Sequence, residues 1–180
     1  MDVDELVRRI VKASVDGGVP AVREEVDRLI SDPTGLTEAL PEPRLPAMES
    51  LYVSDDLTIM NVVWGPRMYI GPHDHRMWAC IGIYGGREDN QLYWREDRSI
   101  ASVGGRSLNA GESISLGEVA VHSVHNPLDR LTGAIHVYGG AFLTEPRSEW
   151  DLETMTERPS SAAKAWQAFE ESARAMTAEA

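Results

Sequence analysis

The stretch Gly71–Gly86 reads GPHDHRMWACIGIYGG and holds two histidines two positions apart, together with the single cysteine of the chain. Residues i and i+2 of an extended strand project to the same side. His73 and His75 therefore direct two imidazoles towards one point, and imidazole is a common ligand of zinc, iron, copper and nickel. The pattern indicates half of a metal site, with a pair of surface histidines as the alternative.

A third ligand is available in GESISLGEVAVHSVHNP, which spans positions 111–127. Glycine turns flank a short strand there, and His122 follows on the next strand, where a hairpin could bring it opposite the first two histidines. Strict alternation turns His125 to the other side of that strand, so we expect it beside the site or at the surface. No carboxylate occupies the next inward positions after His75, so the predicted ligand set is neutral and keeps open positions.

Short runs rich in Val, Ile, Tyr and Trp surround these motifs from about position 51 onward, and Gly, Asn and Asp separate them. We expect strands at 57–64, 67–70, 77–84, 91–95, 113–116, 119–124 and 134–138. Turn signals every 8 to 12 residues or so are typical of an antiparallel sandwich or barrel.

Helical periodicity occupies both ends of the chain. Gly17 and Gly18 separate two N-terminal apolar stripes, Pro20 suits the first turn of the second helix, and SDPTG ends it. Ser160 or Ser161 can cap a C-terminal helix. The apolar residues expected to turn that helix towards the barrel are Ala162, Trp166, Phe169, Ala173 and Met176. We predict a single domain over 1–180, with a helical N-terminal extension (1–48), a β-barrel (51–145) and a C-terminal helix (160–180) packed outside.

The composition limits the classes of function. Of 180 residues, 42% are apolar, which suffices for a core. A formal charge of −12 disfavours nucleic acid and anionic membranes as partners. No apolar run approaches the roughly 20 residues of a membrane span, and the N-terminus lacks the apolar region of a signal peptide. A single cysteine excludes an internal disulfide framework. We expect a soluble cytoplasmic protein, and nothing in the sequence selects an oligomeric state.

The motif G-P-H-D-H and the later H-x-x-x-N resemble the two metal motifs of cupins. More narrowly, positions 64–150 are similar to the bacterial thiol dioxygenases, the group of cysteine dioxygenase and 3-mercaptopropionate dioxygenase. The resemblance implies a mainly β fold, the cupin double-stranded β-helix or jelly-roll barrel. It also implies a mononuclear non-haem iron, Fe(2+), held by His73, His75 and His122.

Two further motifs carry the resemblance. AIHVY resembles the family triad Ser-x-His-x-Tyr, which implies catalytic roles for His136 and Tyr138, with Ala134 in place of the serine. A core histidine and an interface tyrosine are the alternative. Arg147 in EPRSEW follows the tyrosine by nine positions, where the mercaptopropionate type has the arginine that binds the substrate carboxylate. A guanidinium fork suits a carboxylate, and the alternative is a surface ion pair with Glu145 or Glu149.

Cys80 lies where the mammalian cysteine type has a cysteine joined to the triad tyrosine by a thioether. A crosslink between Cys80 and Tyr138 is therefore one alternative. Strict alternation from His75 turns Cys80 away from the metal, so that a bulge would be needed. A small buried apolar side chain is the other alternative.

The resemblance implies a dioxygenase that converts a small carboxylate-bearing thiol, such as 3-mercaptopropionate, to its sulfinate with O2. Arg67, Arg87 and Arg95 are other candidates for the carboxylate anchor. A three-histidine cupin that cleaves C–C bonds of a β-diketone is a second hypothesis. A third is a non-catalytic cupin that binds a small ligand or a metal, with the site closed by His136 or His125 around zinc or nickel.

Overall fold

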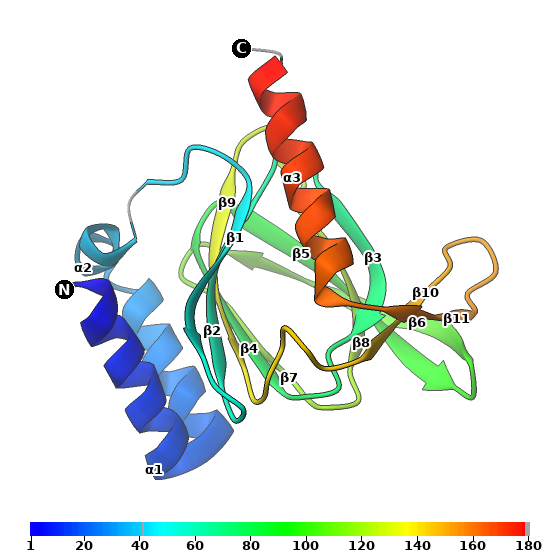
Figure 1. Cartoon of the computed structure of the whole chain (residues 1–180). Coiled ribbons are helices and arrows are strands. Elements are labelled where there is room, and N and C mark those ends of the chain that lie inside the picture. Colours follow the sequence, from blue (N-terminus) through cyan, green and yellow to red (C-terminus); the bar gives the residue numbers. More distant parts are fainter. Residues whose placement is uncertain (41, 179–180) are drawn as a thin grey trace.

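Two antiparallel β-sheets lie face to face at the centre of the molecule, and helices flank them (Figure 1). The computed structural model describes residues 1–40 and 42–178. The helices are α1 Val3–Ile30, α2 Pro33–Ala39 and α3 Ala162–Ala178. The strands are β1 Ala47–Val53, β2 Thr58–Trp64, β3 Tyr69–Asp74, β4 Ala79–Gly85, β5 Arg87–Glu96, β6 Ser99–Asn109, β7 Ser113–Leu116, β8 Val121–His125, β9 Thr132–Tyr138, β10 Arg147–Trp150 and β11 Glu157–Ser160.

The strand order identifies the architecture. One sheet runs β1-β2-β9-β4-β7 and the other β11-β10-β3-β8-β5-β6. Strands β2 to β9 thus divide into two sets of four, β2-β9-β4-β7 and β3-β8-β5-β6, which is the arrangement of a jelly roll. The predicted mainly β fold, a double-stranded β-helix of the cupin type with helices at both ends, is confirmed.

Side-chain alternation divides the five-stranded sheet into two chemically different faces. On β9, Ile135 and Val137 join the apolar cluster beneath α1. Their neighbours His136 and Tyr138 line the cavity between the sheets. Because all seven residues of β9 are buried, the strand has no solvent-facing side. The sequence run TGAIHVY therefore supplies a structural face and a cavity face at once.

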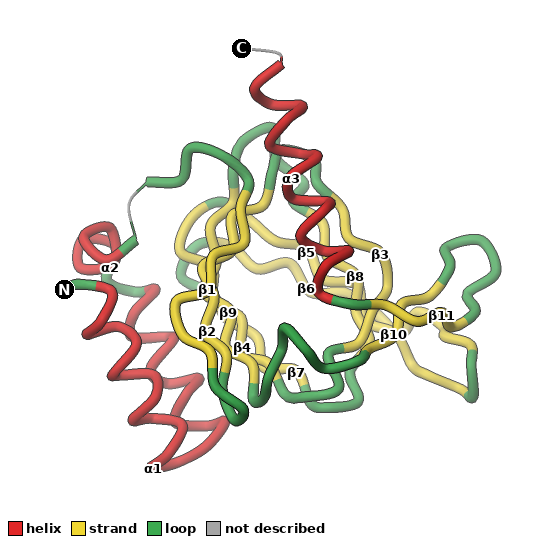
Figure 2. Tube along the Cα trace, in the orientation of Figure 1, coloured by secondary structure: helices red, strands yellow, loops and turns green. Residues whose placement is uncertain are grey.

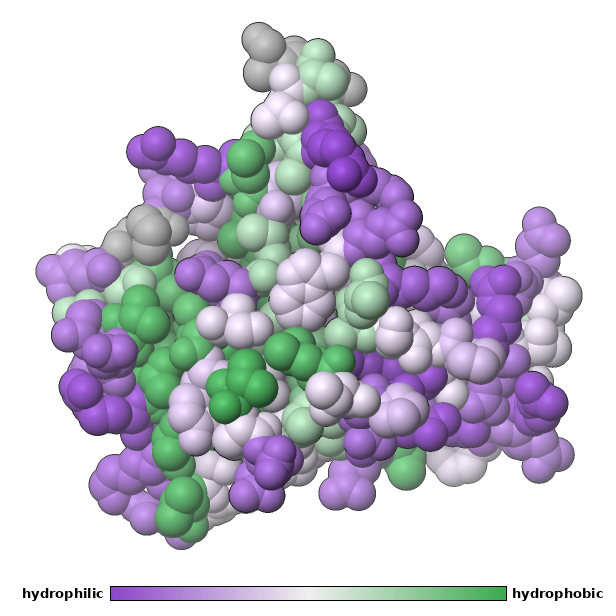
Figure 3. Space-filling model, viewed as in Figure 1, coloured by the Kyte–Doolittle hydropathy of each residue, from purple (hydrophilic) through white to green (hydrophobic). Residues whose placement is uncertain are grey.

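The N-terminal helices cover the outer face of this sheet, where α1 contacts β4 and β7. Gly18 breaks the regular path of α1 with φ 60° and ψ −149°, a backbone conformation that glycine tolerates. The predicted break at Gly17 and Gly18 is confirmed, with Pro20 just beyond it. In the view of Figure 3, hydrophilic residues cover the free side of α3, and hydrophobic ones gather where α1 meets the barrel. None of the described helices is long and apolar enough to cross a membrane.

Helix α3 lies over one end of the barrel rather than along its outer wall (Figure 2). Phe169 is buried there, with its ring centroid 5.0 Å from that of Trp64. Of the residues expected to face the barrel, Ala162 and Phe169 are fully buried. Trp166, Ala173 and Met176 are half-buried. The helix thus forms part of the wall of the central cavity.

The β region extends beyond the expected 51–145 at both ends. Strand β1 begins at Ala47, directly after the prolines of the connector, and β10 and β11 lie beyond position 145. Strand β6 is almost entirely exposed and carries Gly and Ser, so it lacks the apolar alternation that marks a strand in sequence. Helix α2 begins at Pro33 after an Asp32 cap, within the segment expected only to end the preceding helix.

Candidate metal centre

Three histidine Nε2 atoms converge at one end of the cavity. His73 lies near the end of β3 and pairs with His122 of β8, while His75 follows directly after β3. The Nε2 atom of His75 is 3.2 Å from that of His73 and 3.3 Å from that of His122. Metal–nitrogen bonds of about 2.0–2.1 Å bring ligand nitrogens to roughly this separation. Across residues 1–40 and 42–178, no carboxylate, thiol or further imidazole joins this cluster.

At His73 and His122, the hydrogen bond of the other ring nitrogen leaves Nε2 free for a metal. His73 Nδ1 lies 2.9 Å from the carbonyl oxygen of Gly71, and His122 Nδ1 lies 2.8 Å from Asn90 Oδ1. Each Nδ1–H donates to its oxygen, so the Nε2 lone pair points into the cluster. Burial lowers the pKa of all three imidazoles, and for His75 and His122 the pKa lies well below the ordinary value. The neutral form that binds a metal therefore prevails at pH 7.

The cluster opens into a cavity of about 540 Å³ between the two sheets. Its walls are mostly apolar, and α3 closes one side with Ala165 and Phe169. Of the five tryptophans of the chain, Trp64 and Trp150 line this cavity. The space accommodates a small ligand beside a metal held by the three histidines.

Arg147 places a buried cation on the wall of the same cavity. The side chain extends from β10, is 5% exposed, and donates from Nη2 to the carbonyl oxygen of Phe142. Its Cζ lies 3.8 Å from the centroid of the Phe142 ring. No carboxylate of the described residues lies within ion-pair distance, and Nε has no hydrogen-bond partner among them. Burial lowers the pKa of Arg147, yet a guanidinium stays charged at neutral pH.

An unpaired buried cation is costly unless a ligand supplies the opposite charge. The alternative of a surface ion pair does not match this geometry, because Glu149 instead pairs with Lys164 and Arg158. The other candidate anchors are also occupied elsewhere. Arg67 pairs with Asp129, Arg87 with Asp89 and Arg95 with Glu157.

His136 and Tyr138 stand side by side on β9, with His136 Nδ1 2.8 Å from the Tyr138 hydroxyl oxygen. The Tyr138 ring meets that of His75 edge-on at 5.0 Å between centroids and stacks on Phe142 at 3.8 Å. Burial raises the pKa of Tyr138, so its side chain remains a phenol at neutral pH and can donate a hydrogen bond. The tyrosine therefore contacts both a predicted metal ligand and the cavity.

Cys80 lies on the opposite face of the sheet from Tyr138. Ala79 pairs directly with Tyr138 and Cys80 with Val137, in an unbroken register from Ala79 to Ile83. The thiol packs in the apolar cluster beneath α1, and burial raises its pKa to about 11. The bulge that a Cys80–Tyr138 crosslink requires is absent from this part of β4, so that alternative is not compatible with the fold. Cys80 acts as a small buried apolar residue.

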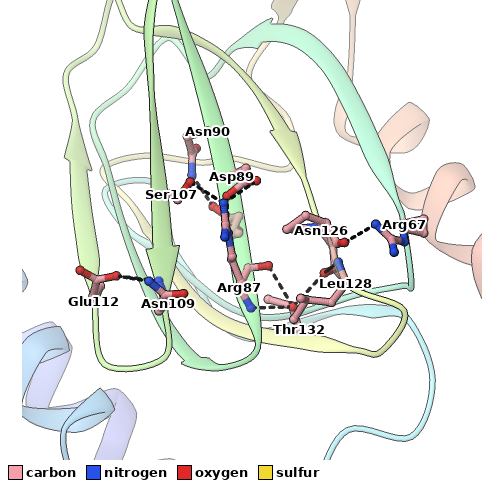
Figure 4. A network of polar contacts seen from close by, with 12 residues as sticks. Arg67, Arg87, Asp89, Asn90, Ser107, Asn109, Glu112, Asn126, Leu128 and Thr132 are labelled. Atoms are coloured by element: carbon pink, nitrogen blue, oxygen red, sulfur yellow. Dashed lines mark hydrogen bonds and ion pairs between the residues drawn. The ribbon is translucent and has the colours of Figure 1, made fainter.

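Two residues near the second motif lie away from the cluster. His125 ends β8 and packs near Tyr69, at 6.3 Å between ring centroids. Asn126 donates from Nδ2 to the carbonyl oxygens of Gly65 and Arg130, each at 2.8 Å, and its Oδ1 accepts from the Thr132 hydroxyl at 3.1 Å. Figure 4 shows Asn126 with Leu128 and Thr132, and these contacts fix the loop before β9. The asparagine of H-x-x-x-N thus has a structural role here.

Three residues around the site carry roles that sequence reasoning missed. Glu88 and Asn90 lie on β5, and Phe142 lies in the loop between β9 and β10. The i, i+2 spacing of Glu88 and Asn90 in GREDNQ is the available signal, since it places both side chains on one side of a strand. That signal is informative only once β5 is known to pair with β8, the strand of His122.

No family model matches the chain. Solved structures with a partial likeness include an oxalate oxidase in complex with the substrate analogue glycolate, at 15% identity and TM-score 0.44, covering 56% of this chain and 54% of that one. A protein from Bacillus halodurans is 17% identical with a TM-score of 0.48, and the match covers 56% of this chain and 83% of that one. An RmlC-like cupin of Methanocaldococcus jannaschii gives 13%, TM-score 0.45 and coverage of 57% and 86%. This chain spans about half of the oxalate oxidase chain. Likeness this distant carries no information on the reaction.

Proposed function

We propose that the protein is a mononuclear non-haem iron dioxygenase that oxidises a small carboxylate-bearing thiol, of the 3-mercaptopropionate kind, to its sulfinate. The observation that carries the proposal is the buried, unpaired guanidinium of Arg147 in the same cavity as the three-histidine cluster. A substrate with a carboxylate at one end and a soft metal ligand at the other satisfies both features. The resemblance in HDH, in HSVHN and in AIHVY supports the same reaction class.

The reaction balances without an organic cofactor. A thiolate and O2 give a sulfinate, so that both oxygen atoms end on sulfur, which loses the four electrons that dioxygen gains. Ferrous iron on His73, His75 and His122 would supply one-electron chemistry and lower the pKa of the bound thiol. The three neutral imidazoles fit a divalent cation and leave its charge uncompensated, which favours an anionic ligand.

The residues around the cluster have separable tasks. Arg147 binds and orients the substrate carboxylate through its guanidinium fork, which fixes the distance from the carboxylate to the sulfur. Tyr138 presents its hydroxyl beside His75, and His136 holds that hydroxyl through Nδ1. The apolar wall formed with Phe142 and Phe169 excludes water from the reacting groups.

Oxygen consumption by iron-loaded protein tests the proposal. The substrates are 3-mercaptopropionate, cysteine and cysteamine, and labelled O2 checks that two oxygen atoms enter the product. We expect 3-mercaptopropionate to be oxidised most efficiently and cysteamine least, because cysteamine has no carboxylate for Arg147. The absence of oxygen uptake with all three thiols would contradict the proposal.

The two alternatives make different demands on the site. A closed, non-catalytic site needs a fourth protein ligand, and neither His125 nor His136 joins the three-histidine group. A C–C-cleaving dioxygenase of the β-diketone type uses the same open metal site. Oxygen uptake with a β-diketone such as acetylacetone, and none with the thiols, would favour that reaction over thiol oxidation.

A further inference from the structure

A chain of buried polar groups runs behind the cavity from a predicted metal ligand to Tyr138. His122 Nδ1 lies 2.8 Å from Asn90 Oδ1, and Asn90 Nδ2 donates to Glu88 Oε1 at 2.9 Å. The second oxygen of Glu88 lies 3.7 Å from His136 Nε2, and His136 Nδ1 lies 2.8 Å from the Tyr138 hydroxyl. Glu88 is fully buried and stands at the middle of this series of polar groups.

The hydrogen-bond direction at the His122 end follows from the donor inventory. A carboxylate only accepts, so Asn90 turns its NH2 group towards Glu88 and its carbonyl oxygen towards His122. His122 must then carry its proton on Nδ1, which leaves Nε2 free for the metal. Glu88 thus determines, through Asn90, which nitrogen of a predicted metal ligand is available.

The other end of the chain contains two unpaired atoms. Glu88 Oε2 and His136 Nε2 are both buried, and neither has a hydrogen-bond partner among the described residues. Buried polar atoms nearly always find a partner. The 3.7 Å between them exceeds a hydrogen bond, so contact requires a shift of about half an ångström or one bridging water.

An acceptor beside His136 Nε2 determines the tautomer of that ring. With the proton on Nε2, Nδ1 has a lone pair and accepts a hydrogen bond from the Tyr138 hydroxyl. A purely structural role for Glu88 does not account for its burial, because within the described residues it has no Arg or Lys partner that would stabilise a buried charge. Its two oxygens are instead divided between the metal side and the tyrosine side.

We propose that Glu88 is a positioning residue that sets the tautomers of both His122 and His136. The first half requires only that the three-histidine cluster binds a metal. The second half rests on the proposed function, because it concerns the hydrogen bond of Tyr138. One buried carboxylate thereby couples metal affinity to the orientation of the tyrosine hydroxyl.

Two substitutions separate these halves. In Glu88→Gln, the new amide oxygen still accepts from Asn90, so zinc affinity stays close to that of the wild type. The amide NH2 then faces His136 Nε2 and moves the ring proton to Nδ1. In Glu88→Leu, Asn90 loses its orienting acceptor, and we expect zinc affinity to fall by roughly 10- to 100-fold. Asp89→Asn is the matched control, because Asp89 pairs with Arg87 instead.

The readouts are zinc affinity by chelator competition and the histidine tautomers by ¹⁵N NMR of the zinc-loaded protein. An unchanged His136 tautomer in Glu88→Gln would overturn the tyrosine half. Wild-type zinc affinity in folded Glu88→Leu would overturn the ligand half. Should Glu88→Leu fail to fold, Asn90→Leu replaces it, with the same expected loss of affinity. Neither readout uses thiol oxidation, so a failure of the proposed function remains distinguishable from a failure of this inference.

Discussion

The two sides of the five-stranded sheet differ in how completely the buried polar atoms are paired: the outer side packs beneath α1, and the inner side faces the cavity that it shares with the six-stranded sheet. The outer face, beneath α1, is apolar, with Cys80, Ile135 and Val137 at its centre. Six buried side-chain polar atoms lack a hydrogen-bond partner within the described residues. Five of these lie in or beside the cavity: Trp64 Nε1, Glu88 Oε2, His136 Nε2, Arg147 Nε and Trp150 Nε1. The sixth, Ser115 Oγ, lies on β7, across from Cys80.

This difference separates stability from function. Unpaired buried polar atoms cost free energy, and folded proteins retain them mainly where a ligand, an ion or a water completes them. The outer face therefore stabilises the fold, while the cavity side, to which both sheets contribute, keeps polar groups available for the proposed metal and substrate. Substitutions on the outer face should therefore lower the free energy of unfolding and leave metal affinity unchanged, whereas substitutions at the cavity should lower metal or substrate affinity with little loss of stability.

Removal of one of the three predicted metal ligands should have the largest effect. His122→Ala leaves two histidines, so we expect metal affinity to fall by more than the roughly 100-fold upper range for residues that support ligands. Thiol oxidation should be lost with it. Chelator competition measures the affinity, and His125→Ala, on the same strand but outside the cluster, serves as the control. Wild-type metal content in His122→Ala would contradict the assignment of the centre.

A cavity on the outer face should affect stability alone. Ile135 is fully buried beneath α1, so Ile135→Ala should lower the free energy of unfolding by about 2–5 kcal/mol. The folded fraction should still bind one metal ion per chain with wild-type affinity. Urea unfolding of the metal-free protein, followed by metal titration, measures both quantities. A loss of metal affinity without loss of stability would break the contrast between the faces.

Arg147→Met should show the reverse pattern. Loss of hydrogen bonds to a charged group costs about 1.5–3 kcal/mol, so substrate affinity should fall by roughly 10- to 150-fold. The free energy of unfolding should be unchanged or higher, because an apolar side chain replaces a buried, unpaired cation. Steady-state kinetics and urea unfolding give the two values. Arg147→Lys, which keeps the charge and loses the fork, should lie between wild type and Arg147→Met in affinity.

The smallest expected effect is on the pH dependence of stability, which should come from the three histidines at the cavity and not from the outer face. Burial lowers the pKa values of His73, His75 and His122, so the unfolded chain binds protons near pH 6.5 that the folded chain does not. Stability of the metal-free protein is thus complete above about pH 6.5 and falls as the pH is lowered towards the folded pKa values.

Urea unfolding between pH 7.5 and 5 measures this slope. His122→Asn should reduce it, because one of the three groups no longer titrates. Ile135→Ala should keep the slope at a lower overall stability. A profile that does not change with pH in the wild type would contradict the burial of neutral imidazoles at the site.

Sequence reasoning succeeded where the signal is local. The spacing of His73 and His75 requires only a strand, and the structure brings both together with His122. Strand β7 was predicted at its observed bounds because it is short, alternates serine with an apolar residue and is flanked by glycines. Strand β6 escaped prediction because it is an exposed edge without apolar alternation.

The surroundings of the histidines could not be predicted, since they depend on pairing between distant strands. Arg147 is buried because β10 lies between β3 and β11, a position that no local pattern reveals. Glu88 and Asn90 reach the site because β5 lies beside β8. The contacts that join His122 to Tyr138 through Asn90 and Glu88 can therefore be recognised only in the folded structure.

Because of helix α3, the three histidines and one wall of the cavity come from separate parts of the chain. The three histidines come from positions 73–122, whereas one wall of the cavity comes from a helix that begins at Ala162. Ala165 and Phe169 are four positions apart and thus share one side of that helix. Substitution of Ala165 or Phe169 therefore alters the shape of the cavity and leaves the three histidines in place. The shape of the cavity is thus set by a different part of the chain from the one that supplies the three histidines.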